Sequence, residues 1–252
     1  MRAIFSDIHG NLEAFQAVLA ELPRQHATSV YNLGDTMGCG PNPIECLDLA
    51  MGMEVVLLGI FDHGVLFDTD GFGPSAEQSV FWARNLLESS VEEPAVRERR
   101  FTFLAGLSPS HREDDVLYVH GSPRKPLCEY VFPEDINNEP KMSEIGKRFD
   151  RVCFTGNTGV PGVFVQRGPG RWEFFGPEDC VGGFPVVGPR VLCNVGAVGW
   201  PRDGDWRACY VLFDGEAIWF RRVEYDVEAT VRKIYAIPML SNIYGNWLRE
   251  GR

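Results

Sequence analysis

The chain has 252 residues, a formal net charge of −11 at pH 7 and 44% hydrophobic residues. The acidic balance repels a phosphate backbone, which excludes general nucleic-acid binding by a basic face. The hydrophobic share suffices for a sizeable core, and no apolar run reaches the roughly 18 residues that cross a bilayer. Residues 1–11 are too polar for the apolar segment of a signal peptide. We therefore expect a cytoplasmic protein that does not act at a membrane, with its seven cysteines as reduced thiols.

The first part of the chain alternates short apolar strands with helices. Residues 12–22 carry apolar side chains at the 3.6-residue period of an amphipathic helix, and Asn11 is a suitable N-cap. Strands are expected at residues 2–6, 29–35 and 53–59, and helices at residues 11–25 and 44–51. Each strand ends in a polar residue or a glycine, at the edge where open α/β sheets carry their chemistry.

The second part of the chain is richer in β structure. A mostly helical stretch is expected over residues 76–105, and a last helix over residues 226–237. Strands are expected at residues 115–123, 151–159, 162–166, 171–175, 190–199, 207–215 and 217–225. No linker, low-complexity tract or internal repeat divides the chain, so residues 1–252 are expected to form a single domain.

Polar side chains that ligate metals recur at the strand ends. Asp7 and His9 alternate on an extended segment and so point the same way, which lets a carboxylate and an imidazole meet one ion. Taken alone, Asp7 would cap the next turn. Asp35 ends the next strand, Asp62 follows the third, and His120 ends a fourth. This series indicates a cluster of metal ligands at one edge of a sheet.

The same order of motifs carries a resemblance to a known family. The chain reads SDIHGN, then LGD, then GIFD, then a lone His120 before GSPR, then TGNTG and NVGAVGWPRDGD. It resembles the calcineurin-like metallophosphoesterases, in particular a bacterial branch of small phosphodiesterase-like members, from Arg2 to about residue 224. The resemblance implies an α/β fold of two mixed β-sheets packed face to face and flanked by helices, an αββα sandwich with a two-metal site on one edge.

The resemblance also implies which ligands the chain keeps and which it lacks. In the family, the motifs D-x-H, GD, GNHD, a lone His and GHTH hold two cations that clamp a phosphate, and the His of GNHD is the general acid. The matching ligands kept here are Asp7, His9, Asp35 and His120. Ligand positions are changed to Ile60, Asn157 and Gly159, and the general acid to Phe61. The two-metal site therefore reads as dismantled.

The changed residues predict a different use of the same edge. They lie in strand-end loops, whereas the glycines, turns and helices of the rest of the chain match the family pattern. This indicates an active site repurposed by natural divergence or engineered by design. The residues expected to line it and bind substrate are Ile60, Phe61, Asn157, Trp200 and Trp206. The expected catalytic groups are a thiol, Cys39 or Cys128, with a base among His9, His63 and His120. The leading hypothesis is a metal-independent hydrolase of small-molecule esters that requires no cofactor.

Two other functions stay open on the sequence. The first is a residual metal-dependent phosphoesterase that holds one divalent cation (Mn, Fe, Zn or Mg) with Asp7, His9, Asp35 and His120. Its substrate would be a small-molecule phosphoester. The second is a catalytically inactive binding module that keeps the fold.

Overall fold

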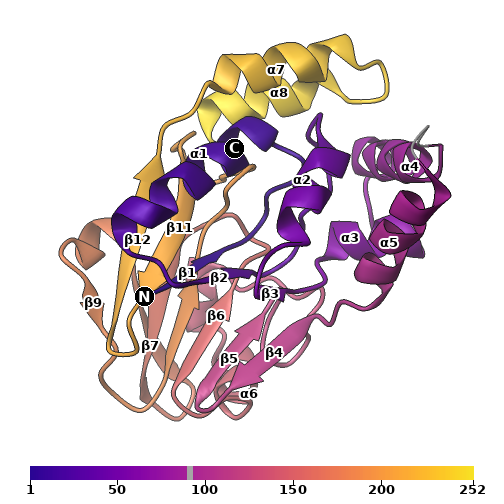
Figure 1. The fold of residues 1–252 in the computed structure, drawn as a ribbon. Helices are drawn as coiled ribbons and strands as arrows, with labels where there is room; N and C mark the ends of the chain where they lie inside the picture. Colours follow the sequence, from indigo (N-terminus) through magenta and orange to yellow (C-terminus); the bar gives the residue numbers. More distant parts are fainter. Residues whose placement is uncertain (90–92) are drawn as a thin grey trace.

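The computed structural model describes residues 1–89 and 93–252, which form two packed β-sheets with helices outside them (Figure 1). From one edge of the first sheet to the other, the hydrogen-bonded strands are β3 (Val55–Val56), β2 (Ser29–Asn32), β1 (Arg2–Phe5), β11 (Ala208–Phe213), β12 (Ala217–Val223) and β9 (Phe184–Pro185). The second contains β4 (Ser110–Glu113), β5 (Val116–Val119), β6 (Val152–Thr155), β10 (Val191–Asn194), β7 (Gly162–Gly168) and β8 (Arg171–Phe175). Both sheets mix parallel and antiparallel pairs. The predicted fold class is confirmed.

The helices are partly those that the sequence predicts. They are α1 (Leu12–Glu21), α2 (Pro43–Ala50), α3 (Ile60–Leu66), α4 (Pro74–Glu88), α5 (Pro94–Ala105), α6 (Glu139–Gly146), α7 (Val227–Ala236) and α8 (Asn242–Glu250), with 3₁₀ turns at Leu22–Gln25, Pro133–Asn137 and Pro177–Cys180. The expected helical stretch 76–105 is two helices, and the part of it at 90–92 lies outside the described residues. The short helices α3, α6 and α8 were not predicted from the sequence.

The space between the sheets is the main core. Ile4 and Phe213 of the first sheet meet Phe154 and Val163 of the second. The rings of Phe154 and Phe213 lie 5.0 Å apart in an edge-to-face contact. This packing holds the two sheets in a fixed relation, so the strand ends of both come together at one edge.

Strand direction decides which residues reach that edge. β1 runs parallel to β2, so the segments after both strands leave the first sheet at the same end. β5 runs parallel to β6, which does the same for the segments that contain His120 and Asn157 in the second sheet. The candidate ligands thus come from two sheets and meet only because the sheets pack.

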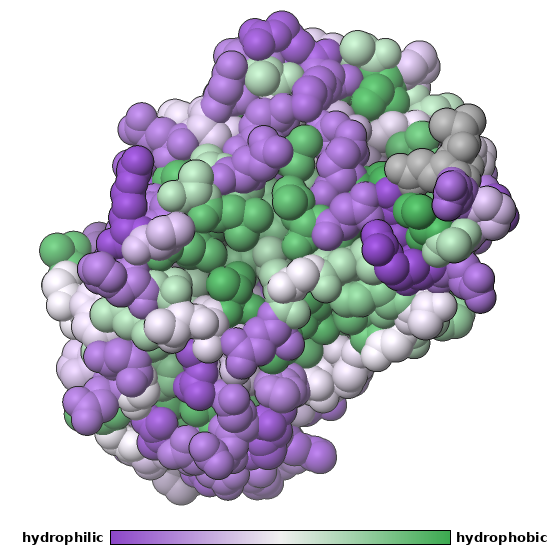
Figure 2. Space-filling view, viewed as in Figure 1, coloured by the Kyte–Doolittle hydropathy of each residue, from purple (hydrophilic) through white to green (hydrophobic). Residues whose placement is uncertain are grey.

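The helices cover three sides of this sandwich. On the first sheet, Phe15 of α1 packs on Phe5 with ring centroids 5.7 Å apart. On the second, α6 is buried through Met142 and Ile145. The pair α7 and α8 lies side by side against α1 at the top of Figure 1, with α3, α4 and α5 to its right. Figure 2 shows apolar side chains gathered between α1 and α2, where Leu19 and Leu49 line a groove.

Asn11 joins three of these elements, so its replacement should cost more than the loss of an ordinary helix cap. Its Oδ1 accepts from Ala14 N at 3.1 Å, and its Nδ2 donates to Gly199 O at 3.1 Å. We expect Asn11→Ala to lower the free energy of unfolding by about 2 kcal/mol, since a cap is lost and a buried carbonyl loses its donor. The matched control is Asn138→Ala, which removes the single side-chain cap of α6 and should cost about 1 kcal/mol. Urea denaturation compares the two, and equal losses would contradict the expectation.

Candidate metal-binding site at the edge of the sheets

Four side chains with metal-ligating atoms converge at this edge. Nε2 of His9 lies 3.6 Å from Oδ1 of Asp7 and 3.7 Å from Oδ2 of Asp35. Nε2 of His120 lies 3.4 Å from the same Oδ2 of Asp35. Ligating atoms of Asp7, Asp35 and His120 all lie within 4.8 Å of one another. Each of the four residues is at most 3% exposed, so the cluster is buried.

The hydrogen bonds of His120 leave one ring nitrogen facing the carboxylates. Its Nδ1 lies 2.9 Å from the carbonyl oxygen of Leu33, which can only accept, so Nδ1 carries the proton and donates. Nε2 is buried and has no hydrogen-bond partner among the described residues. A histidine that ligates a metal through one nitrogen characteristically donates its other N–H in this way. His120 is therefore oriented as a ligand.

Two buried carboxylates at this spacing require positive charge beside them. Burial lowers the pKa of His120, but the charges of Asp35 and Asp7 outweigh it and raise that pKa to about 9. For Asp7, burial raises the pKa, but the contact with His9 and the charge of His120 outweigh it and lower the pKa below its ordinary value. The cluster thus favours a cation in contact with both carboxylates.

The backbone at the ligands is held in an unusual conformation. Asp7, His9, Asp35 and Asn157 have φ values of 56°, 49°, 53° and 65°, in the left-handed region. Such residues persist only where the surrounding structure fixes them, and they concentrate at functional sites. Gly59 allows one of the close approaches, since a Cβ there would lie 2.1 Å from Oδ1 of Asp35.

Asp62 holds the loops that carry Asp35 and the start of α3. Its carboxylate accepts from the backbone N–H groups of Met37 at 2.9 Å and Gly59 at 3.1 Å. Burial, together with the charge of Asp35, raises the pKa of Asp62 to about 6. The backbone N–H of Phe61 donates to Oδ1 of Asp35 at 2.7 Å. Asp62 is thus a positioning residue, and α3 orients Asp35.

Two of the four altered positions, Asn157 and Phe61, contact the cluster. Ile60 is the half-buried first residue of α3. Asn157 is 5% exposed, donates its backbone N–H to Oδ2 of Asp7 at 2.9 Å, and has a buried side-chain nitrogen without a partner among the described residues. A Cβ on Gly159 would lie 3.1 Å from Cγ of Arg202, so that side chain occupies the space beside the glycine.

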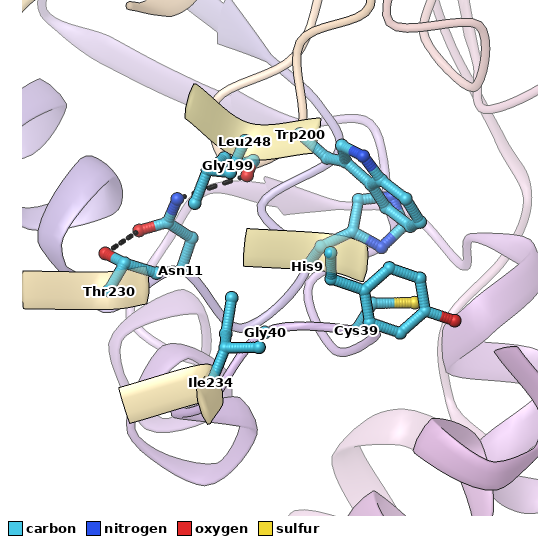
Figure 3. A pocket seen from close by; sticks show the side chains of 10 residues that line it. His9, Asn11, Cys39, Gly40, Gly199, Trp200, Thr230, Ile234 and Leu248 are labelled. Atoms are coloured by element: carbon cyan, nitrogen blue, oxygen red, sulfur yellow. Dashed lines mark hydrogen bonds between the residues drawn. The ribbon is translucent and has the colours of Figure 1, made fainter. Parts of the chain in front are cut away.

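Aromatic rings close over His9. The ring centroid of His9 lies 4.8 Å from that of Phe61 and 5.0 Å from that of Trp200, both edge to face. Phe61 is 8% and Trp200 7% exposed. The cavity that His9 and Trp200 line together with residues of α7 and α8 holds about 20 Å³ (Figure 3), which is room for a single water. Both rings are thus largely buried, and the cavity beside His9 is too small for an aromatic ligand.

The expected thiol chemistry meets unfavourable surroundings. Cys39 lines this cavity with His9, but its Sγ pairs with Oγ of Ser79 at 3.3 Å, and burial raises the pKa of the thiol to about 12. Cys128 is exposed, in a surface cleft with Tyr130. Neither thiol makes a hydrogen bond with a histidine in the described part of the chain.

Two further predicted residues lie away from the cluster. The ring of His63, on α3, packs 4.8 Å from that of Phe67. Trp206 packs edge to face against Tyr225 at 5.7 Å and does not line the cavity of His9. Conversely, the sequence analysis missed Tyr244, which lines that cavity, and Arg202, which stands inside the quoted PRDGD motif. No local pattern indicated Tyr244.

The chain is similar along its whole length to proteins of known fold. No family profile matches the sequence. The uncharacterized protein MJ0912 of Methanocaldococcus jannaschii is 28% identical over 263 residues, which cover 99% of this chain and 96% of that protein. The crystal structure of a metallophosphoesterase from Sphaerobacter thermophilus superposes with a TM-score of 0.82, at 29% identity, and covers 100% of this chain and 99% of that one. The chain has the calcineurin-like metallophosphoesterase fold.

A second solved structure supports the same fold. The hypothetical protein PH1004 of Pyrococcus horikoshii has a TM-score of 0.75 at 19% identity, with 100% of this chain and 99% of that chain covered. On the metallophosphoesterase fold, the cluster of Asp7, His9, Asp35 and His120 stands at the sheet edge that the sequence resemblance implied. Among the described residues, no helix is long and apolar enough to span a membrane.

Proposed function

We propose that this protein is a hydrolase of phosphoesters that depends on a single divalent cation held by Asp7, His9, Asp35 and His120. The observation that carries the proposal is the convergence of these four buried side chains, with Nδ1 of His120 donating to Leu33 O and Nε2 facing Asp35. Two carboxylates and two imidazoles form a donor set suited to Mn²⁺, Fe²⁺ or Zn²⁺. The similar protein from Sphaerobacter thermophilus, a metallophosphoesterase by name, supports the same class of reaction.

The residues of the chain would divide the work at such an ion. Asp7, His9, Asp35 and His120 would hold it, and Asn157 stands beside them with an amide that could add a weak ligand. A bound divalent cation would supply Lewis acidity toward a phosphoryl oxygen and favour a water nucleophile at neutral pH. Phe61 and Trp200 would shield the imidazole of His9 from solvent. A low dielectric around the ligands strengthens their hold on the ion.

One ion rather than two follows from the altered positions. Ile60 and Gly159 have no side-chain donor, and the space beside Gly159 is filled by Arg202. Oδ2 of Asp35 faces both imidazoles, and ligating atoms of Asp7, Asp35 and His120 all lie within 4.8 Å of one another. We therefore expect one equivalent of metal per chain.

The thiol-based ester hydrolysis that the sequence analysis favoured has less support. A protonated thiol is a poor nucleophile, and burial keeps Cys39 protonated. Cys128 is exposed but has no histidine among the residues that line its cleft. Exchange of either cysteine therefore serves as a control for the proposed reaction.

Titration with Mn²⁺ and a rate assay on bis-p-nitrophenyl phosphate together test the proposal. We expect Mn²⁺ to bind once per chain in calorimetry, and we expect hydrolysis that requires the added ion and stops with EDTA. Cys39→Ala and Cys128→Ala should keep this activity. Hydrolysis that persists in EDTA and is lost in either cysteine variant would overturn the proposal in favour of the thiol mechanism. Binding of Mn²⁺ with no turnover of this phosphodiester would favour an inactive binding module.

A further inference from the structure

A second cleft adjoins the cluster and shares one wall with it. Trp200, Arg202, Trp247 and Arg252 line a cleft of about 310 Å³, at the lower end of the range for small-ligand sites. Its lining consists of two tryptophans and two arginines, of which Arg252 pairs with Glu250 at 3.0 Å. The shared wall is Trp200, whose ring also packs against the ring of His9 with 5.0 Å between the centroids.

Several contacts hold the indole of Trp200. Its Nε1 donates to a backbone oxygen of Arg252 at 2.9 Å. The rings of Trp200 and Trp247 lie 6.2 Å apart and 25° from parallel. The ring of Tyr244 packs edge to face on Trp200 at 5.2 Å. Trp247 is half-buried, so part of its ring surface is open to a ligand.

Arg202 is a positioned cation without an anion. Its Cζ lies 4.7 Å from the ring centroid of Trp200, and its backbone N–H donates to Gly159 O at 3.0 Å. Within residues 1–89 and 93–252 its exposed guanidinium makes no ion pair and no hydrogen bond. The acidic side chains nearby in sequence have other partners, Asp203 with Arg222 and Asp205 with Arg207.

With no carboxylate partner among the described residues, the guanidinium of Arg202 is available to an anionic ligand. Arginine held flat on an indole presents its N–H groups at the edge, where they bind phosphate oxygens in pairs. An adjacent open indole offers a flat ring a stacking surface. The cleft thus fits an anion and a planar ring in one ligand.

We infer that this cleft binds a phosphate ester whose alcohol part carries a flat aromatic ring, the class to which nucleoside monophosphates belong. Arg202 holds the phosphate and Trp247 stacks on the ring. The role of this cleft as a substrate site rests on the proposed function. The bound phosphate would lie beside Trp200, which packs on His9. Arg202 and Trp247 are then binding residues that set which esters are accepted.

Calorimetry with adenosine 5′-monophosphate in EDTA tests the site without the metal. We expect one equivalent to bind, and Arg202→Gln and Trp247→Leu each to raise its Kd about 10-fold, for the lost charge-assisted pair and the lost stacking. Arg202→Lys should fall between wild type and Arg202→Gln. The matched control is Arg167→Gln, since Arg167 lies on β7 and pairs with Glu173, and it should bind as the wild type does.

The probes also separate the two halves of the ligand. Adenosine and inorganic phosphate should each bind more weakly than the monophosphate, and binding as tight by either alone would overturn the inference. So would unchanged affinity in both Arg202→Gln and Trp247→Leu. Binding in EDTA together with no metal-dependent turnover would sustain the site while the proposed reaction fails. Metal-dependent hydrolysis without binding in EDTA would sustain the reaction and overturn the site.

Discussion

Asp35→Asn is expected to weaken Mn²⁺ binding by at least about 100-fold and to remove the metal-dependent hydrolysis. Replacing a residue that only hydrogen-bonds a ligand already lowers metal affinity by about 10- to 100-fold, and replacing the ligand itself should lower it more. Oδ2 of Asp35 is the atom that faces both imidazoles, at 3.7 Å from His9 and 3.4 Å from His120. An amide in its place removes the negative charge that faces both imidazoles. Calorimetric titration with Mn²⁺ measures the loss directly.

The variant should fold, because an asparagine oxygen can still accept the backbone N–H of Phe61 that Oδ1 accepts now. The matched control is Asp70→Asn, the same chemical change at an exposed carboxylate outside the cluster. It should bind Mn²⁺ as the wild type does. If Asp35→Asn binds Mn²⁺ as tightly as Asp70→Asn, the cluster does not hold the ion.

Phe61→His is expected to accelerate hydrolysis of diphenyl phosphate by about 100-fold, the lower end of what a positioned general acid contributes. The ring of Phe61 lies 4.8 Å from that of His9, so an imidazole there would stand next to the proposed ion. Phenol is a poor leaving group that needs a proton. The p-nitrophenolate of bis-p-nitrophenyl phosphate leaves without one, so the same variant should change that rate far less.

The difference between the two substrates is the readout. A change in metal affinity would move both rates together, whereas proton donation moves only the first. Phe72→His is the matched control, because Phe72 packs on Phe61 at 4.7 Å but not on His9. Equal changes on both substrates, or the same gain in Phe72→His, would show that position 61 does not act as an acid.

Part of the site could be predicted because strand direction is readable from sequence. Asp7 and Asp35 both follow short apolar strands separated by a helix, a pattern that gives parallel neighbours and brings both residues to one edge. The motif order then assigned His9 and His120 as ligands. The fold followed from the same motifs, since they extend over nearly the whole chain.

Other parts depended on contacts between distant segments. Trp200 and Trp206 stand six residues apart in one loop, yet the first packs on His9 and the second on Tyr225. No local pattern separates them, because the path of the loop decides which ring turns inward. Phe61 was expected to line an open pocket, but it is buried by Phe72 and Trp200 instead.

By itself the sequence determined the fold, the four retained ligands and the loss of the side-chain donors at Ile60 and Gly159, because each is a matter of residue type at a strand end. The tertiary structure alone decided that the two sheets bring His120 to Asp35 and that Leu33 fixes its proton. It also decided that α8 closes the cavity and that Arg202, beside Trp200, has no ion-pair partner among residues 1–89 and 93–252. These depend on packing between segments far apart in the chain, which residue spacing does not encode.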